Sequence, residues 1–259
     1  MLRSAWGPFV AEVQATSDLL SDLTAPRVDH VVYFFYSVKP RDVKSLYERG
    51  DDVAIAYGEL TNGIRAVNSW IDGSLGSIEA TVQVLLQWTL AQGGGLLMHA
   101  SAGVYQGQGW LIPGVSGAGK STSVREGGFD LVLSDEMVIV KPVPSKSEIS
   151  TIRTHYRLFS TPFWSEGRTL PLVVAEEPLN LVGFPIKAKR AQLLPCSSTK
   201  AVSLFLQAVT AYERLGSEAE KLEQNSHLFE HACRVIELTP HRGLAFPKYG
   251  PWRALISDT

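Results

Sequence analysis

Cysteine is nearly absent from this sequence: its 259 residues include two, Cys196 and Cys233, and neither belongs to a C-x-x-C pair. We therefore expect neither a disulfide framework nor a cysteine-built zinc site, and a reducing, cytoplasmic environment. Long hydrophobic runs are also lacking. The longest, such as His30–Tyr36 and Leu131–Val140, have the length of strands, whereas a membrane span needs about 20 residues. No membrane partner is expected.

An excess of one charge sign is missing as well, since 24 Lys and Arg residues accompany 26 Asp and Glu residues, for a net charge of −2. This balance gives no electrostatic reason to expect a nucleic-acid partner. A secretory leader is not expected either, because Glu12 and Asp18 interrupt the region where such a leader has its apolar core. The 45% share of hydrophobic residues is typical of a folded globular protein.

No repeat, low-complexity tract or composition shift divides the chain, so we predict a single domain over residues 1–259. Its first part, residues 1–95, is expected to be strand-rich with one helix, Ser77–Gln92. The rest, residues 96–259, is expected to form the core. Predicted strands there are Leu96–Tyr105 and Trp110–Ile112 as a hairpin, Leu131–Val140, Leu179–Phe184, Val235–Leu238 and Gly243–Phe246, with helices over Thr199–Arg214 and Glu218–Ala232. The stretch from Pro142 to Glu177 is expected to be irregular or to form short edge strands.

A glycine-rich motif carries the strongest functional signal. Residues 114–121, GVSGAGKS, match the phosphate-loop pattern GxxxxGK(S/T) at every specified position. Glycines let backbone N–H groups turn toward phosphate oxygens. Lys120 is expected to reach the β- and γ-phosphates of a nucleotide, and the Ser121 hydroxyl to bind Mg²⁺. The residues predicted to contact the nucleotide are Gly114, Ser116, Gly117, Ala118, Gly119, Lys120, Ser121 and Thr122.

The residues after this motif differ from those of common phosphate-loop ATPases and GTPases. Gly127-Gly128 end the helix that starts at Lys120, and the acidic pair Asp135-Glu136 follows only fifteen and sixteen residues after that lysine. An antiparallel hairpin leading into the loop is also foreign to a doubly wound sheet. We therefore predict an α/β fold with a mixed sheet of another architecture.

Residues 98–136 resemble the core of HPr kinase/phosphorylase-related kinases, which share a fold with phosphoenolpyruvate carboxykinase. The matching features are His99 on the strand before the loop, the loop itself, the short helix ending in glycine and the pair Asp135-Glu136. The segment TPFWSEG, residues 161–167, is similar to one in the smaller kinases of this kind, some of which phosphorylate a peptide serine. The resemblance implies a mixed-sheet phosphate-loop domain of the phosphoenolpyruvate carboxykinase/HPr kinase type.

Roles follow from this resemblance. It implies that Asp135 acts as the base or orients the acceptor hydroxyl, that Glu136 holds Mg²⁺ with Ser121, and that His99 contacts the catalytic aspartate. Together with Lys120, Asp135 and His99 form the expected catalytic set. The implied donor is ATP·Mg²⁺, and the implied acceptor is a serine of a peptide or protein, or else a small metabolite. Such kinases are often oligomeric, which makes a homo-oligomer an expectation.

Several residues outside the motif have alternative interpretations. Arg153, Arg157 and Arg168 either meet phosphate or an acidic substrate or are ordinary surface arginines. The basic run 187–190 is interpreted as a solvated face. Residues 227–231, HLFEH, fit the H-x-x-E-H pattern of inverted zinc peptidases, but no third ligand is evident, so both histidines are interpreted as surface or packing residues of a helix.

Two functions of different classes fit these signals. The first is a kinase that transfers the γ-phosphate of ATP to a hydroxyl, and the second is a nucleotide-binding regulator or scaffold with little turnover. Asp135 discriminates between them, because a protein that only binds nucleotide does not need it.

Overall fold

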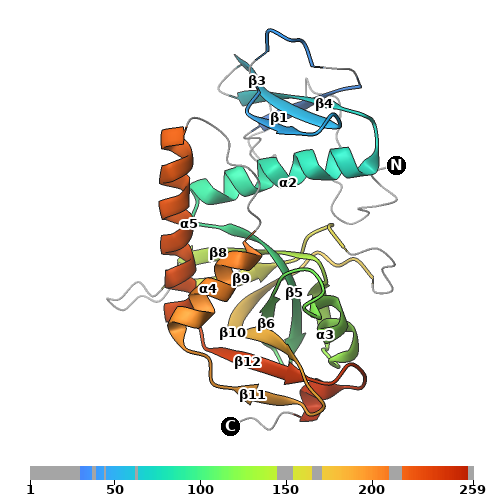
Figure 1. Cartoon of the computed structure of the whole chain (residues 1–259), viewed down its shortest axis with the longest axis vertical. Coiled ribbons are helices and arrows are strands. Elements are labelled where there is room, and N and C mark those ends of the chain that lie inside the picture. Colours follow the sequence, from blue (N-terminus) through green and yellow to red (C-terminus); the bar gives the residue numbers. More distant parts are fainter. Residues whose placement is uncertain are drawn as a thin grey trace. The chain divides into compact units, whose positions relative to one another are not determined.

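The computed structural model describes residues 30–36, 39–43, 45–61, 64–144, 154–164, 171–209 and 218–255. They belong to two compact units, one within Met1–Leu85 and Glu213–Lys221, the other within Leu86–Tyr212 and Leu222–Thr259 (Figure 1). Each unit combines helix and strand, and both sheets mix parallel with antiparallel pairs. The predicted α/β class with a mixed sheet is therefore confirmed.

The first unit is built on a four-stranded sheet in the order β1-β4-β3-β2. Strands β3 (Val53–Thr61) and β4 (Ile64–Ile71) form an antiparallel hairpin. The short β2 (Tyr47–Arg49) pairs antiparallel with β3, and β1 (His30–Phe35) pairs parallel with β4. Apolar residues in the middle of this sheet, Ile55 and Val67 among them, are fully buried.

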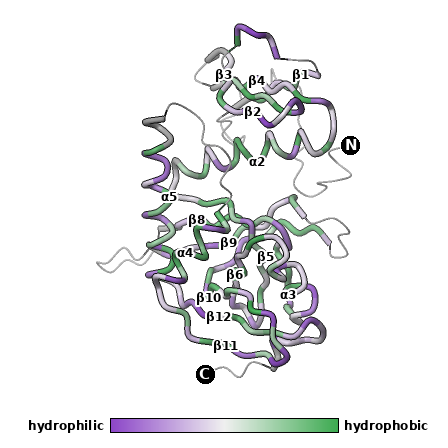
Figure 2. Tube along the Cα trace, in the orientation of Figure 1, coloured by the Kyte–Doolittle hydropathy of each residue, from purple (hydrophilic) through white to green (hydrophobic). Residues whose placement is uncertain are grey.

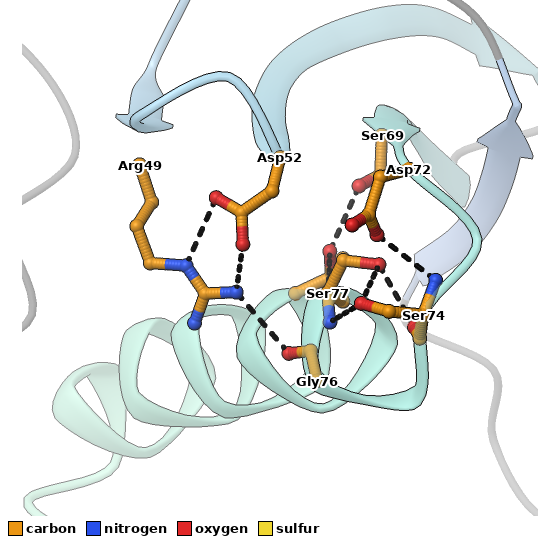
Figure 3. Close-up of polar contacts among 8 residues, drawn as sticks. Arg49, Asp52, Ser69, Asp72, Ser74, Gly76 and Ser77 are labelled. Atoms are coloured by element: carbon orange, nitrogen blue, oxygen red, sulfur yellow. Dashed lines mark hydrogen bonds and ion pairs between the residues drawn. The ribbon is translucent and has the colours of Figure 1, made fainter.

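Helix α2 (Leu75–Gln92) confirms the predicted helix but buries a different face from the one its apolar spacing indicates. Ser77 and Thr81 are both 0% exposed, whereas Val82 and Leu85 are only half-buried. The Thr81 hydroxyl lies 2.9 Å from that of Ser69 in β4. At the start of the helix, the Ser74 hydroxyl accepts from the Ser77 N–H at 3.1 Å (Figure 3). These hydrogen bonds satisfy the small polar side chains, which makes their burial favourable.

The second unit contains a larger sheet in the order β11-β12-β10-β6-β5-β8-β9, with β7 also paired to β5. Because β10 pairs with both β6 and β9, strands β6, β5, β8, β9 and β10 form a closed circuit. The strands are β5 (Leu96–Tyr105), β6 (Gln108–Pro113), β7 (Leu131–Ser134), β8 (Met137–Pro144), β9 (Thr154–Phe159), β10 (Glu176–Lys187), β11 (Gln192–Leu194) and β12 (His241–Phe246).

Strands β5 and β6 form the predicted antiparallel hairpin. Its two-residue turn, Gln106-Gly107, has positive φ at both residues, as a tight hairpin turn requires. The region expected to be irregular or to form short edge strands contributes one short strand, β9, which pairs on both sides, with β8 and with the start of β10. Figure 2 shows hydrophobic residues along most of β5, which pairs with β6 on one edge and with β8 and β7 on the other.

The helices of this unit differ from the sequence prediction at their ends. Helix α4 (Ser198–Ala208) ends before the predicted Arg214, because Val209 is extended and forms a bridge with Met98 of β5. Helix α5 (Glu218–Leu238) includes the residues predicted as the strand Val235–Leu238. Val235 and Ile236 are buried in the core on this helix, so their apolar run reflects packing and not a strand.

Two apolar clusters cover opposite faces of the larger sheet, because successive strand residues point to opposite sides. Leu111 of β6 packs into a cluster with Phe205 of α4 and Ile236 of α5. Its neighbours on either side, Trp110 and Ile112, pack into a second cluster with residues of the seven-residue helix α3 (Lys120–Glu126) and the 3₁₀ helix η2 (Trp252–Leu255). Within the described part of the chain, no helix has both the length and the apolar character of a membrane span.

Candidate functional site

The glycine-rich loop connects β6 to α3, so that a buried strand holds one end and a short helix the other. Gly117 and Gly119 have φ values of 75° and 104°, in the left-handed region that a side chain at these positions would oppose. The Ala118 N–H donates to the Val115 carbonyl at 3.1 Å, which closes the turn. Ser116 and Gly117 at the tip of the loop are exposed.

Lys120 is the first residue of α3 and is only 5% exposed. Its ammonium donates to the Val115 carbonyl at 3.2 Å, so it folds back over the loop. Burial lowers the pKa of Lys120 from its ordinary value, and the nearby carboxylates of Glu136 and Asp135 partly oppose this shift. A phosphate group that entered the loop would therefore lie next to the buried Lys120 ammonium, whose hydrogen-bond partner here is the Val115 carbonyl.

The acidic pair lies where two strands meet. The predicted continuous strand Leu131–Val140 is wrong here, because β7 ends at Ser134 and β8 begins at Met137, with Asp135 and Glu136 in the bend between them. The Ser134 hydroxyl accepts from the N–H groups of both Glu136 and Met137, at 3.3 and 3.2 Å, which stabilises the bend.

The bend also brings the acidic pair next to the loop. The Ser121 hydroxyl donates to the Asp135 carbonyl at 3.1 Å, and the Ala100 N–H donates to the Glu136 carbonyl at 3.0 Å. Asp135 is 2% exposed, so it is buried beside the loop.

His99 is the last residue of β5 that pairs with β8, and pairing with β6 on the other edge of β5 begins at Ala100. The His99 Nε2 atom hydrogen-bonds Glu136 Oε1, the neighbour of the carboxylate we expected it to contact. This hydrogen bond holds the pKa of Glu136 below its ordinary value, against the opposing effect of burial. Glu136 is therefore a carboxylate kept ionised.

Of the predicted site residues, all but Gly114, Ala118 and Asp135 line one pocket of about 540 Å³. From the predicted set, His99, Lys120, Ser121 and Glu136 line it together with loop residues. The remaining lining residues, which the site prediction missed, are Arg125, Lys187, Ala188, Phe246 and Lys248.

The interpretation of residues 187–190 as a solvated face agrees with the exposure of Lys187, Lys189 and Arg190, but Lys187 also lines the pocket. It ends β10, which is parallel to β6 on one side and to β12 on the other. The carboxyl ends of these three strands lie at one edge of the sheet, where ligands of α/β proteins bind. No sequence signal marked Lys248 or Phe246, because only the parallel pairing of β10 with β12 brings them to the loop.

Helix α3 is held by the segment around η2. Trp252 is fully buried, donates from its indole N–H to the Ser123 carbonyl at 3.1 Å, and stacks on Phe246 with ring centroids 5.2 Å apart. The Arg253 N–H donates to the Gly127 carbonyl at 3.0 Å. A helix this short is marginal alone, so these contacts fix its position.

The other candidates lie elsewhere. Arg157 contacts Glu176 of β10, at 3.3 Å between the guanidinium and the carboxylate, whereas Arg153 and Arg168 fall outside the described residues. On α5, His227 lies 3.7 Å from Glu223 and 3.9 Å from Glu230. Across the described residues, no group of three or more His, Cys, Asp or Glu side chains has the arrangement of a metal site.

The site therefore combines a glycine-rich loop, a buried lysine, a hydroxyl and a histidine-bound carboxylate around one pocket. This set can bind a phosphate chain and a hard divalent cation.

No protein-family model matches this chain, and no curated protein shows a significant match to it.

Proposed function

We propose that the protein is a kinase that transfers the γ-phosphoryl group of ATP to a hydroxyl group, favouring a serine of a peptide or protein over a small metabolite. One observation carries this proposal: Lys120 and Ser121 of the loop line the same pocket as the His99–Glu136 pair. Phosphoryl transfer needs positive charge on the phosphates, a metal-binding oxygen and a group that orients the nucleophile, all close together. The fold we propose is of the phosphoenolpyruvate carboxykinase/HPr kinase type.

The donor set suits Mg²⁺. This ion takes hard oxygen ligands, commonly one or two carboxylates with substrate phosphates and water. The Ser121 hydroxyl and the Glu136 carboxylate both line the pocket, and the lowered pKa of Glu136 keeps it ionised. When bound, Mg²⁺ supplies charge neutralisation on the phosphate oxygens.

The remaining roles belong to the chain itself. Lys120 binds the β- and γ-phosphates, and His99 orients Glu136 through their hydrogen bond. Because Glu136 is hydrogen-bonded to His99 and assigned to Mg²⁺, we assign the orientation or deprotonation of the acceptor hydroxyl to Asp135. Asp135 is buried and does not itself line the pocket, but it lies directly before the pocket-lining Glu136 in the bend.

Incubation with γ-labelled ATP, Mg²⁺ and a pool of serine-containing peptides tests the proposal. We expect labelled phosphate on a peptide hydroxyl, with nucleotide binding measured by calorimetry on the same preparation. Binding of ATP without transfer to any peptide or small hydroxyl would favour a nucleotide-binding regulator or scaffold. The absence of nucleotide binding would overturn both functions.

Metal dependence provides a second prediction. Ser121→Ala and Glu136→Gln should each raise the Mg²⁺ concentration for half-maximal transfer, because both side chains are assigned to the same ion. His99→Ala should act in the same direction by about 10-fold, as residues that orient a metal ligand do. It should add little to Glu136→Gln, since both act through one carboxylate.

Titration of transfer activity with Mg²⁺ measures these effects. Glu126→Gln is the matched control, because Glu126 lies on α3 but does not line the pocket. Identical Mg²⁺ titrations in the wild type and the site variants would remove the metal assignment.

A further inference from the structure

The pocket carries more positive charge than the transfer reaction accounts for. Four cationic side chains, Lys120, Arg125, Lys187 and Lys248, line it. Among the described lining residues Glu136 is the one acidic side chain, which leaves a surplus of three positive charges, and His99 already hydrogen-bonds that carboxylate. The proposed mechanism uses Lys120, so Lys187 and Lys248 require another explanation.

These two lysines lie on adjacent parallel strands. Lys187 of β10 is in register with Phe246 of β12, and the Ala188 N–H donates to the Phe246 carbonyl at 3.0 Å. Lys248 follows two residues after Phe246 and lies over the Tyr249 ring, 5.0 Å from its centroid. Both lysines are exposed, as is Tyr249, so a ligand in the pocket can reach both ammonium groups.

The strand order gives the pocket two distinct ends. Across the sheet the order is β12, β10, β6, β5 and β8. Lys248 follows β12, Lys187 ends β10, and Lys120 follows the loop after β6. His99 lies on β5 and Glu136 directly before β8. One end of the pocket is therefore basic and the other acidic, with Lys120 between them.

We infer that a nucleoside triphosphate lies across the pocket with its γ-phosphoryl group toward Glu136 and its α-phosphate at Lys187 and Lys248. This inference rests on the proposed function. The γ-phosphoryl group must face the residues that orient the acceptor, so the rest of the donor extends in the opposite direction. Lysine is a common point-charge partner for phosphate oxygens.

A consequence is selection of the donor. Inorganic pyrophosphate has two phosphates, which Lys120 and the loop accommodate, and it lacks the third phosphate that would reach the lysine pair. The pair therefore favours a nucleoside triphosphate over pyrophosphate as the donor.

Calorimetric titration of the full chain with MgATP and with magnesium pyrophosphate tests this inference. Lys187→Gln and Lys248→Gln should each weaken MgATP binding by about fivefold or more, the effect of losing one charge-assisted hydrogen bond. Binding of pyrophosphate should change by less than about twofold in the same variants. Lys189→Gln is the matched control, because it removes the same charge from an exposed residue of the same segment that does not line the pocket.

Three results of these titrations would overturn the inference, and a fourth would overturn the proposed function. Unchanged MgATP affinity in both variants would overturn the inference, and so would equal weakening of MgATP and pyrophosphate. An equal effect of Lys189→Gln would show a general electrostatic field and would overturn it too. A wild-type protein that binds neither ligand would instead defeat the proposed function.

Discussion

Replacement of Asp135 by asparagine is expected to lower phosphoryl transfer by about 10²–10⁴-fold while nucleotide affinity changes little, because the variant keeps the shape of the side chain and loses its basicity. The Asp135 carboxylate is buried beside the loop, and its carbonyl accepts from Ser121. Single-turnover transfer and nucleotide binding, measured on the same preparations, separate the two effects.

Two comparisons keep this prediction specific. Thermal unfolding of Asp135→Asn should match that of the wild type within a few degrees, which excludes simple misfolding. The double variant with Glu136→Gln should show both a slower transfer step and a higher Mg²⁺ requirement, because the two acids have different roles. Full transfer activity in Asp135→Asn would remove the proposed mechanism, and an equal loss of nucleotide binding would indicate a metal or structural role.

Replacement of Lys120 by alanine is expected to weaken ATP·Mg²⁺ binding by roughly 10- to 100-fold, the range that follows from loss of a hydrogen bond to a charged group. The wild-type ammonium group is buried and donates to the Val115 carbonyl, so it is already held over the loop before a ligand binds. The measurement is calorimetric titration with ATP in the presence of Mg²⁺.

Lys141→Ala provides the charge-matched control, because Lys141 is exposed on β8 and does not line the pocket. Circular dichroism should show the same secondary structure in both variants as in the wild type. Unchanged nucleotide affinity in a folded Lys120→Ala protein would contradict the assignment of the loop as a phosphate loop.

The sequence was informative about this site wherever the signal was local. Backbone geometry at Gly117 and Gly119 requires glycine, so the loop is visible as a motif. The acidic pair is visible because two adjacent acids interrupt an apolar run. Lys187 and Lys248 gave no such signal, because their place in the pocket depends on the pairing of β10 with β6 and β12. Pairing between strands that are distant in the sequence cannot be predicted from the spacing of neighbouring residues.

The same distinction explains the errors in the fold. Periodicity located α2 but not its buried face, because hydrogen bonds bury Ser77 and Thr81 where a count of apolar residues expects larger side chains. The run Val235–Leu238 has the composition of a strand, yet it is the last turn of α5 and packs against the sheet. In both cases tertiary contacts, and not the local conformational preference of the residues, determined the structure.

The contacts of Phe246, Trp252 and Arg253 have a consequence for biosynthesis. These residues come from the far end of the described chain, yet they support a helix that begins at Lys120. A nascent chain can pair β5 with β6 early, but α3 lacks its stacking and hydrogen-bond partners until β12 and η2 have left the ribosome. The ability to hold nucleotide is thus acquired late in synthesis, after the central hairpin is complete.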